Sequence, residues 1–156
     1  MKYKLTICIA TYNRAKFLDE LLNNLIQQVL DLDEVSILVV DGCSTDHTQE
    51  ICNKYSKLSD SFKSILLEKK GGIDKDYDIA VRSAESEFCW LFCDDDSMEP
   101  ESVKSILKKL MYEDPDLMII NSSLCDYSLD RILQKKSLDI DSDILIENEI
   151  DMQDRI

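Results

Sequence analysis

The first 121 residues alternate between short apolar runs and segments of helical periodicity, and this alternation most constrains the fold. Residues 5–10, 35–40 and 88–93 are continuous apolar, β-rich runs, as in buried strands. Residues 64–68 form a weaker run, and residues 116–121 form a fifth. Helical spacing of apolar residues, or helix-starting signals, predict helices over residues 15–28, 76–84 and 100–113. Residues 43–46 offer N-cap candidates for a further helix that ends at about residue 55. Repetition of strand and helix predicts an α/β fold: a mainly parallel, doubly wound, Rossmann-like sheet flanked by helices.

Polar clusters follow three of the expected strands. They comprise residues 11–14, 41–46 and 94–96. In parallel α/β sheets, ligands bind outside the carboxyl ends of the strands. The three clusters therefore predict one binding site at a single edge of the sheet.

The acidic run Asp94-Asp95-Asp96 ends the expected fourth strand. Adjacent carboxylates repel one another, whereas hard divalent cations favour oxygen ligands. A solvated turn with a capping Asp is the alternative for this run alone. The neighbouring clusters favour the metal site.

The other clusters offer contacts for a nucleotide, and each has a simpler alternative. Asp41 is placed to accept a hydrogen bond from a base N–H, or to form the turn typical of Asp-Gly. Thr11 and Asn13 provide ligand contacts or cap the following helix. Arg14 meets a phosphate or solvent, and Arg82 meets a base, a phosphate or a surface partner.

The composition of the chain limits the classes of partner that it can bind. The 156 residues carry a net charge of -14, which argues against nucleic acid or an anionic membrane surface as the main partner. Six cysteines without a C-x-x-C pair read as free thiols of a reducing compartment. Because no segment is long enough for a membrane-spanning helix, we expect a cytoplasmic domain, at most peripherally at the inner face of the membrane.

Three ordered motifs resemble glycosyltransferase family 2, which has the inverting GT-A fold. They are Ile9-Ala10-Thr11-Tyr12-Asn13-Arg14, Asp41-Gly42-Cys43-Ser44-Thr45-Asp46-His47-Thr48 and Asp94-Asp95-Asp96-Ser97-Met98-Glu99-Pro100. The segments Gly72-Ile73-Asp74-Lys75-Asp76-Tyr77-Asp78-Ile79-Ala80 and Ile120-Asn121-Ser122-Ser123 more narrowly resemble abequosyltransferase-like enzymes of O-antigen assembly.

The resemblance implies a nucleotide-sugar donor, Mn²⁺ or Mg²⁺, and a glycan or lipid-linked acceptor. The implied donor-binding residues are Thr11, Tyr12, Asn13, Arg14, Asp41, Asp74, Arg82, Asp94 and Asp95. The implied metal ligand is Asp95 first, with Asp96 and Asp94 beside it. The metal would stabilise the leaving diphosphate.

The resemblance also implies two parts. Residues 1–123 would form the nucleotide-sugar-binding domain, and residues 124–156 the start of an acceptor region or an irregular tail of a truncated chain. No catalytic base is identified. Three acids near the end of the chain are better explained as solvated acids of the tail, namely Glu147, Glu149 and Asp151. A catalytically incomplete nucleotide-binding module is the alternative function. A nucleotidyltransferase is a third option, but the basic, Gly-rich loop expected after the first strand is missing.

Overall fold

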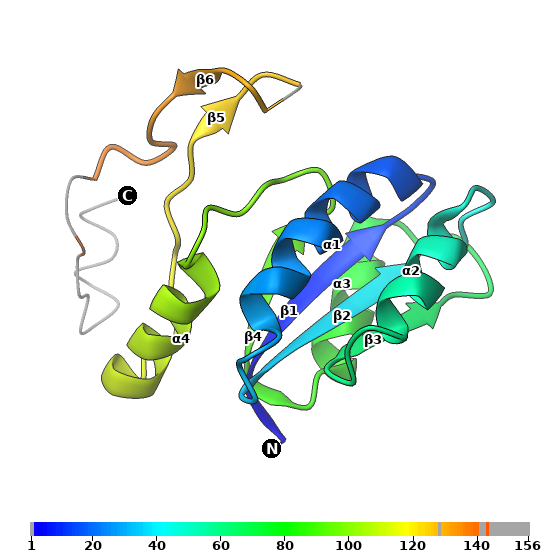
Figure 1. Ribbon diagram of the computed structural model, residues 1–156, viewed down its shortest axis with the longest axis horizontal. Coiled ribbons are helices and arrows are strands. Elements are labelled where there is room, and N and C mark those ends of the chain that lie inside the picture. The colour runs from blue at the N-terminus through cyan, green and yellow to red at the C-terminus, as the bar shows by residue number, and fades with distance from the viewer. Residues whose placement is uncertain (1, 128, 141–142, 144–156) are drawn as a thin grey trace. The chain divides into compact units, whose positions relative to one another are not determined.

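The computed structural model describes residues 2–127, 129–140 and 143. Its centre is a four-stranded parallel sheet (Figure 1). The strands are β1 (Tyr3–Thr11), β2 (Val35–Asp41), β3 (Phe62–Leu66) and β4 (Ser86–Cys93), in the order β3-β2-β1-β4. The predicted parallel α/β sheet is confirmed. The order reverses between β1 and β4, and such switch points bind ligands in open α/β sheets.

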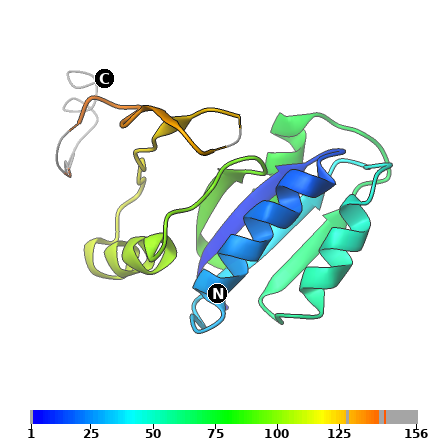
Figure 2. The same cartoon turned by 45° about the horizontal axis from the view of Figure 1, so that its top comes forward.

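Helices cover both faces of this sheet. They are α1 (Ala15–Val29), α2 (Thr48–Ser56), α3 (Ile73–Ser83) and α4 (Ser102–Glu113). Figures 1 and 2 show α1 and α2 side by side on one face and α3 on the other. The doubly wound arrangement is therefore confirmed. No helix in the described part of the chain is long and apolar enough to cross a membrane.

Side chains that alternate along β1 pack into a hydrophobic core on each face of the sheet. Cys8 packs with Leu38, Val40 and Ala80 beneath α3. Because successive strand side chains point to opposite faces, Ile7 and its alternate neighbours face the α1 side. There α1 contributes buried side chains at helical spacing: Leu18, Leu21, Leu22, Leu25, Ile26 and Val29. The buried central strands β1 and β2 thus form a packed support for the loops at their carboxyl ends.

The expectation of a buried strand over residues 88–93 is only half right. The strand exists as β4, but its residues from 87 to 93 are half-buried or exposed, and Leu91 is 52% exposed. Within the described residues β4 pairs with β1 alone, so it lies at the edge of the sheet. Apolar composition identifies a strand but does not distinguish an edge strand from a central one.

The expected strand over residues 116–121 is wrong. The segment has no strand partner in the described chain, and Asn121 instead exchanges hydrogen bonds with Leu138. Ser122 accepts a backbone hydrogen bond from Ser137 at 2.7 Å. An apolar run becomes a strand only where its backbone groups find a ladder.

Residues 129–133 do not form a helical turn. The chain forms the short antiparallel strands β5 (Leu124–Cys125) and β6 (Ile132–Gln134). Leu129 has a φ of 61°, which a right-handed helix excludes. Asp126 Oδ1 accepts the N–H groups of Asp130 and Arg131, which fixes the turn.

The chain divides into two compact units, one up to Pro115 and one from Asp116. This division precedes the expected boundary at residue 123. The functional assignment of the two parts stays a prediction.

Candidate functional site

The carboxyl ends of β1, β2 and β4 bring the three polar clusters to one edge of the sheet. Thr11 is the register partner of Asp41 on β2, and Ala10 is the partner of Cys93 on β4. Asp94 directly follows Cys93 and therefore lies beside Thr11. The switch point between β1 and β4 thus carries polar side chains from both strands.

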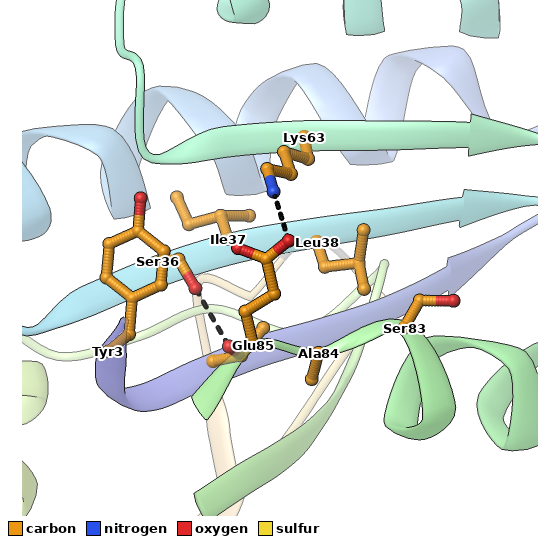
Figure 3. Close-up of a pocket in the computed structure, with 9 residues that line it drawn as sticks. Tyr3, Ser36, Ile37, Leu38, Lys63, Ser83, Ala84 and Glu85 are labelled. Atoms are coloured by element: carbon orange, nitrogen blue, oxygen red, sulfur yellow. Dashed lines mark hydrogen bonds and ion pairs between the residues drawn. The ribbon is translucent and has the colours of Figure 1, made fainter. Parts of the chain in front are cut away.

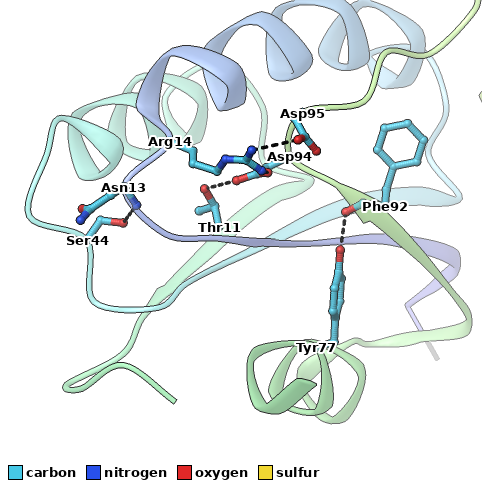
Figure 4. Close-up of polar contacts among 8 residues, drawn as sticks. All are labelled: Thr11, Asn13, Arg14, Ser44, Tyr77, Phe92, Asp94 and Asp95. Atoms are coloured by element: carbon cyan, nitrogen blue, oxygen red, sulfur yellow. Dashed lines mark hydrogen bonds and ion pairs between the residues drawn. The ribbon is translucent and has the colours of Figure 1, made fainter. Parts of the chain in front are cut away.

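Asp94 is the centre of this arrangement (Figure 4). Its Oδ2 accepts a hydrogen bond from the Thr11 hydroxyl at 2.7 Å, and its Oδ1 lies 2.8 Å from Nη1 of Arg14. The other guanidinium nitrogen, Nη2, lies 2.9 Å from Oδ2 of Asp95. Arg14 therefore bridges two consecutive carboxylates, one buried and one exposed.

Burial raises the pKa of Asp94 above its ordinary value. The Thr11 hydroxyl and the Arg14 guanidinium oppose this change. Burial likewise raises the pKa of Asp96, and the charge of Asp95 adds to the increase. The acidic run therefore holds closely spaced charge that a cation would stabilise.

Asp41 is fully buried and organises the loop after β2. Its Oδ1 accepts the backbone N–H of Ser44 at 2.8 Å, and its Oδ2 accepts Nε2 of Gln49 at 2.6 Å. Both oxygens already have a donor. Ser44 was a helix-cap candidate in the sequence, whereas no local signal singled out Gln49.

Asn13 and Asp46 tie the loop after β1 to the loop after β2. The Asn13 backbone N–H donates to Ser44 Oγ at 2.8 Å, and Asn13 Oδ1 accepts from the backbone of Thr45 at 2.7 Å. Asp46 accepts N–H groups at the starts of both helices, from Ala15 at 3.1 Å and from Thr48 at 3.0 Å. Asn13 thus links the two loops and does not cap α1; the carboxylate of Asp46 accepts the N–H at the start of that helix instead.

The remaining predicted residues divide between this edge and elsewhere. Tyr12 meets Lys70, whose Nζ lies 3.9 Å from the centroid of its ring. Asp74 is exposed in the first turn of α3. Arg82 lies in the last turn of the same helix and pairs with Asp78 at 2.8 Å. The structure therefore does not bring Arg82 together with the edge residues.

Tyr77 also supports this edge of the sheet, a role that no sequence pattern indicated. Its hydroxyl donates to the backbone oxygen of Phe92 at 2.9 Å, so α3 holds the end of β4 in place (Figure 4). Burial raises the pKa of Tyr77, which keeps this hydroxyl protonated as a donor. Tyr77 thus supports the segment that carries Asp94.

The acidic run offers suitable donors for a hard cation. No group of three His, Cys, Asp or Glu side chains within the described residues is arranged to hold a metal by itself. Asp94 and Asp95 nevertheless converge on one positive group, the Arg14 guanidinium. Mg²⁺ is usually held by one or two carboxylates together with substrate phosphates. The residues fit a metal that arrives with a diphosphate.

A cavity at the opposite edge of the sheet does not compete for this role. It lies among Tyr3, Ser36 and Lys63, beside the 3.1 Å ion pair of Lys63 with Glu85 (Figure 3). Its volume of about 20 Å³ has room for about one water molecule. A nucleotide does not fit there.

Known proteins similar to this chain are glycosyltransferases. Over 117 residues it is 33% identical to the poly(ribitol-phosphate) β-N-acetylglucosaminyltransferase TarS of Staphylococcus aureus, covering 75% of this chain and 20% of TarS. Over 126 residues it is 27% identical to the abequosyltransferase RfbV of Salmonella typhimurium, covering 78% of this chain and 35% of RfbV. The chain therefore spans between a fifth and about a third of these two relatives.

The fold is shared with a solved structure of S. aureus TarS 1–349 in complex with UDP-GlcNAc. The match has a TM-score of 0.66 and 32% sequence identity, over 78% of this chain and 33% of that chain. The family model for glycosyl transferase family 2 matches residues 6–152. This match includes most of β1, the acidic run and every candidate site residue, so the chain belongs to glycosyl transferase family 2.

Proposed function

We propose that this chain is the donor-binding part of an inverting glycosyltransferase. It would transfer a sugar from a nucleotide-sugar donor to a glycan or lipid-linked acceptor in cell-surface polysaccharide synthesis, such as that of O-antigen. The observation that carries this proposal is the contact of Thr11 and Arg14 with Asp94 and Asp95 at the switch point of the sheet. The similarity to TarS bound to UDP-GlcNAc supports a nucleotide-sugar donor.

The acidic run is the proposed site of Mn²⁺ or Mg²⁺, with Asp95 as the first ligand and Asp96 and Asp94 beside it. When bound, the metal would act as a Lewis acid that offsets charge on the leaving diphosphate. Thr11 holds Asp94 in place through its hydroxyl. Arg14 pairs with Asp94 and Asp95 in the protein alone, and it would contact a donor phosphate if a bound cation took over these carboxylates.

Chemistry at the sugar needs an acceptor hydroxyl that attacks the anomeric carbon and loses its proton to a general base, while the nucleoside diphosphate leaves. The base stays unassigned. Glu147, Glu149 and Asp151 lie outside the residues that the structure describes. We place the reaction in the cytoplasm, with at most peripheral membrane contact, because the six cysteines are free thiols as expected in a reducing compartment.

Calorimetry with UDP, CDP, GDP and dTDP, with and without Mn²⁺, tests the proposal. We expect binding of at least one nucleotide to strengthen with Mn²⁺ and this increase to disappear in Asp95→Asn. Asp60→Asn is the matched control, because Asp60 is an exposed acid just before β3, at the opposite edge of the sheet. Failure of every nucleotide to bind to folded protein would exclude the proposal. Binding without transfer or donor hydrolysis would favour a nucleotide-binding module.

A further inference from the structure

Asp76 is a buried carboxylate that takes no part in the contacts around Asp94. It lies in the first turn of α3 and is only 4% exposed. Its Oδ1 has no hydrogen-bond partner among the described residues. Buried polar atoms are nearly always paired, because an unpaired one loses its hydration without compensation. An unpaired carboxylate oxygen at this depth therefore indicates a missing donor.

Two glycines flank the carboxyl group of Asp76. A Cβ atom on Gly42 would lie 2.8 Å from Oδ2, and one on Gly71 would lie 3.4 Å from Oδ1. Gly42 is in the loop after β2, and Gly71 is in the loop before α3. The carboxyl group therefore faces the edge that carries Asp41, between two backbones that have no side chains. Because Gly71 has no side chain, its backbone can shift away from Oδ1 at little steric cost.

The neighbouring residues make this position suitable for a nucleobase. The half-buried ring of Tyr12, in the loop after β1, contacts the ammonium group of Lys70, in the loop before α3, and the charge of Lys70 acts on Asp76. Asp41 is close enough for its charge to act on Asp76, but its own two oxygens already accept hydrogen bonds from Ser44 and Gln49. Of these two buried carboxylates, Asp76 is the one that lacks a donor.

We propose that Asp76 Oδ1 accepts a hydrogen bond from an N–H of the donor's nucleobase and thereby selects the base. This inference rests on the proposed function, since it assumes a nucleotide at this edge. Uracil, thymine, guanine and cytosine each have a ring N–H or an amino group that can donate to Oδ1. Asp41, by contrast, positions the loop that carries Gly42.

The test compares each nucleotide with its counterpart methylated at that nitrogen. The pairs are UDP with N3-methyl-UDP, dTDP with N3-methyl-dTDP, GDP with N1-methyl-GDP and CDP with N4,N4-dimethyl-CDP. Calorimetry with Mn²⁺ first identifies the parent that binds to the wild type. We expect methylation to weaken its binding about tenfold or more, as for loss of a hydrogen bond to a charged group.

Asp76→Ala should weaken binding of the parent nucleotide about as much and abolish the preference over the methylated form. Asp76→Asn retains an acceptor oxygen and should keep part of the preference. Gly42→Ala pushes the carboxyl group aside and should reduce the preference, which provides a second route if Asp76→Ala does not fold. Asp60→Ala, which removes an exposed acid at the opposite edge, should behave as the wild type.

The outcomes separate this inference from the proposed function. If the wild type binds a nucleotide but Asp76→Ala and Gly42→Ala retain the full preference, Asp76 does not read the base and only this inference fails. If the folded wild type binds none of the four nucleotides, the proposed function itself fails. If the preference for the unmethylated nucleotide is abolished in Asp76→Ala and partly kept in Asp76→Asn, the result supports both this inference and the proposed function.

Discussion

The hydroxyl of Thr11 is the donor that satisfies buried Asp94 from the neighbouring strand. We expect Thr11→Val to reduce the free energy of unfolding by about 1 to 3 kcal/mol, because it leaves Asp94 Oδ2 without the 2.7 Å bond. Thr11→Ser keeps the hydroxyl and should lose much less. Urea denaturation measures both. Equal losses in the two variants would show that the hydrogen bond contributes little.

Asp76 should make stability depend on pH. Burial and the charge of Asp41 raise its pKa above the ordinary 3.8, against the opposing charges of Lys75 and Lys70. The folded protein thus holds this proton more tightly than the unfolded chain does. This tighter binding of the proton stabilises the folded protein below pH 3.8, and the stabilisation is lost as the pH rises through the pKa of Asp76 in the folded protein.

Asp76→Asn has no such proton to lose. Its free energy of unfolding should therefore rise relative to that of the wild type as pH increases from 3.8 toward neutrality. Urea denaturation at a series of pH values measures this difference. A difference that stays constant across the series would contradict the raised pKa.

At the scale of elements, the hydroxyl of Tyr55 joins α2 to α1. It donates to Oδ1 of Asp19 at 2.9 Å and lies 3.0 Å from the backbone oxygen of the same residue, while Lys54 contacts that carboxylate at 2.6 Å. Tyr55→Phe should lower the free energy of unfolding by about 1 kcal/mol, a typical net value for such a bond. Tyr112→Phe is the control, because Tyr112 is 80% exposed. An equal effect on thermal stability in both variants would contradict the role of this contact.

The elements that periodicity predicts correctly are those whose pattern reflects local burial. The run of residues 35–40 matches β2, which is buried along its whole length, and the spacing over residues 15–28 matches α1. The run of residues 116–121 fails because a strand also needs a partner distant in sequence, and composition does not name one. In the site, adjacency in sequence reveals Asp94 and Asp95, whereas Gln49 and Asp76 become visible only when three loops meet.

At the scale of the whole molecule, the compact unit up to Pro115 contains the four-stranded sheet, α1 to α4 and all candidate site residues. A fragment of residues 1–115 should therefore unfold cooperatively and bind the same nucleotide as the full chain. Circular dichroism on heating and calorimetry with Mn²⁺ measure the two properties.

A shorter fragment, residues 1–101, provides the control for this prediction. It keeps the sheet and the acidic run but lacks α4, whose buried Val103, Ile106, Leu107 and Leu110 contribute to the core. Their removal exposes apolar surface on β1 and α1, which α4 contacts, so this fragment should be much less stable. Loss of cooperative unfolding in both fragments would mean that the sheet and its site depend on residues after Pro115. Loss in the shorter fragment alone would identify α4 as the last element that the donor-binding edge requires.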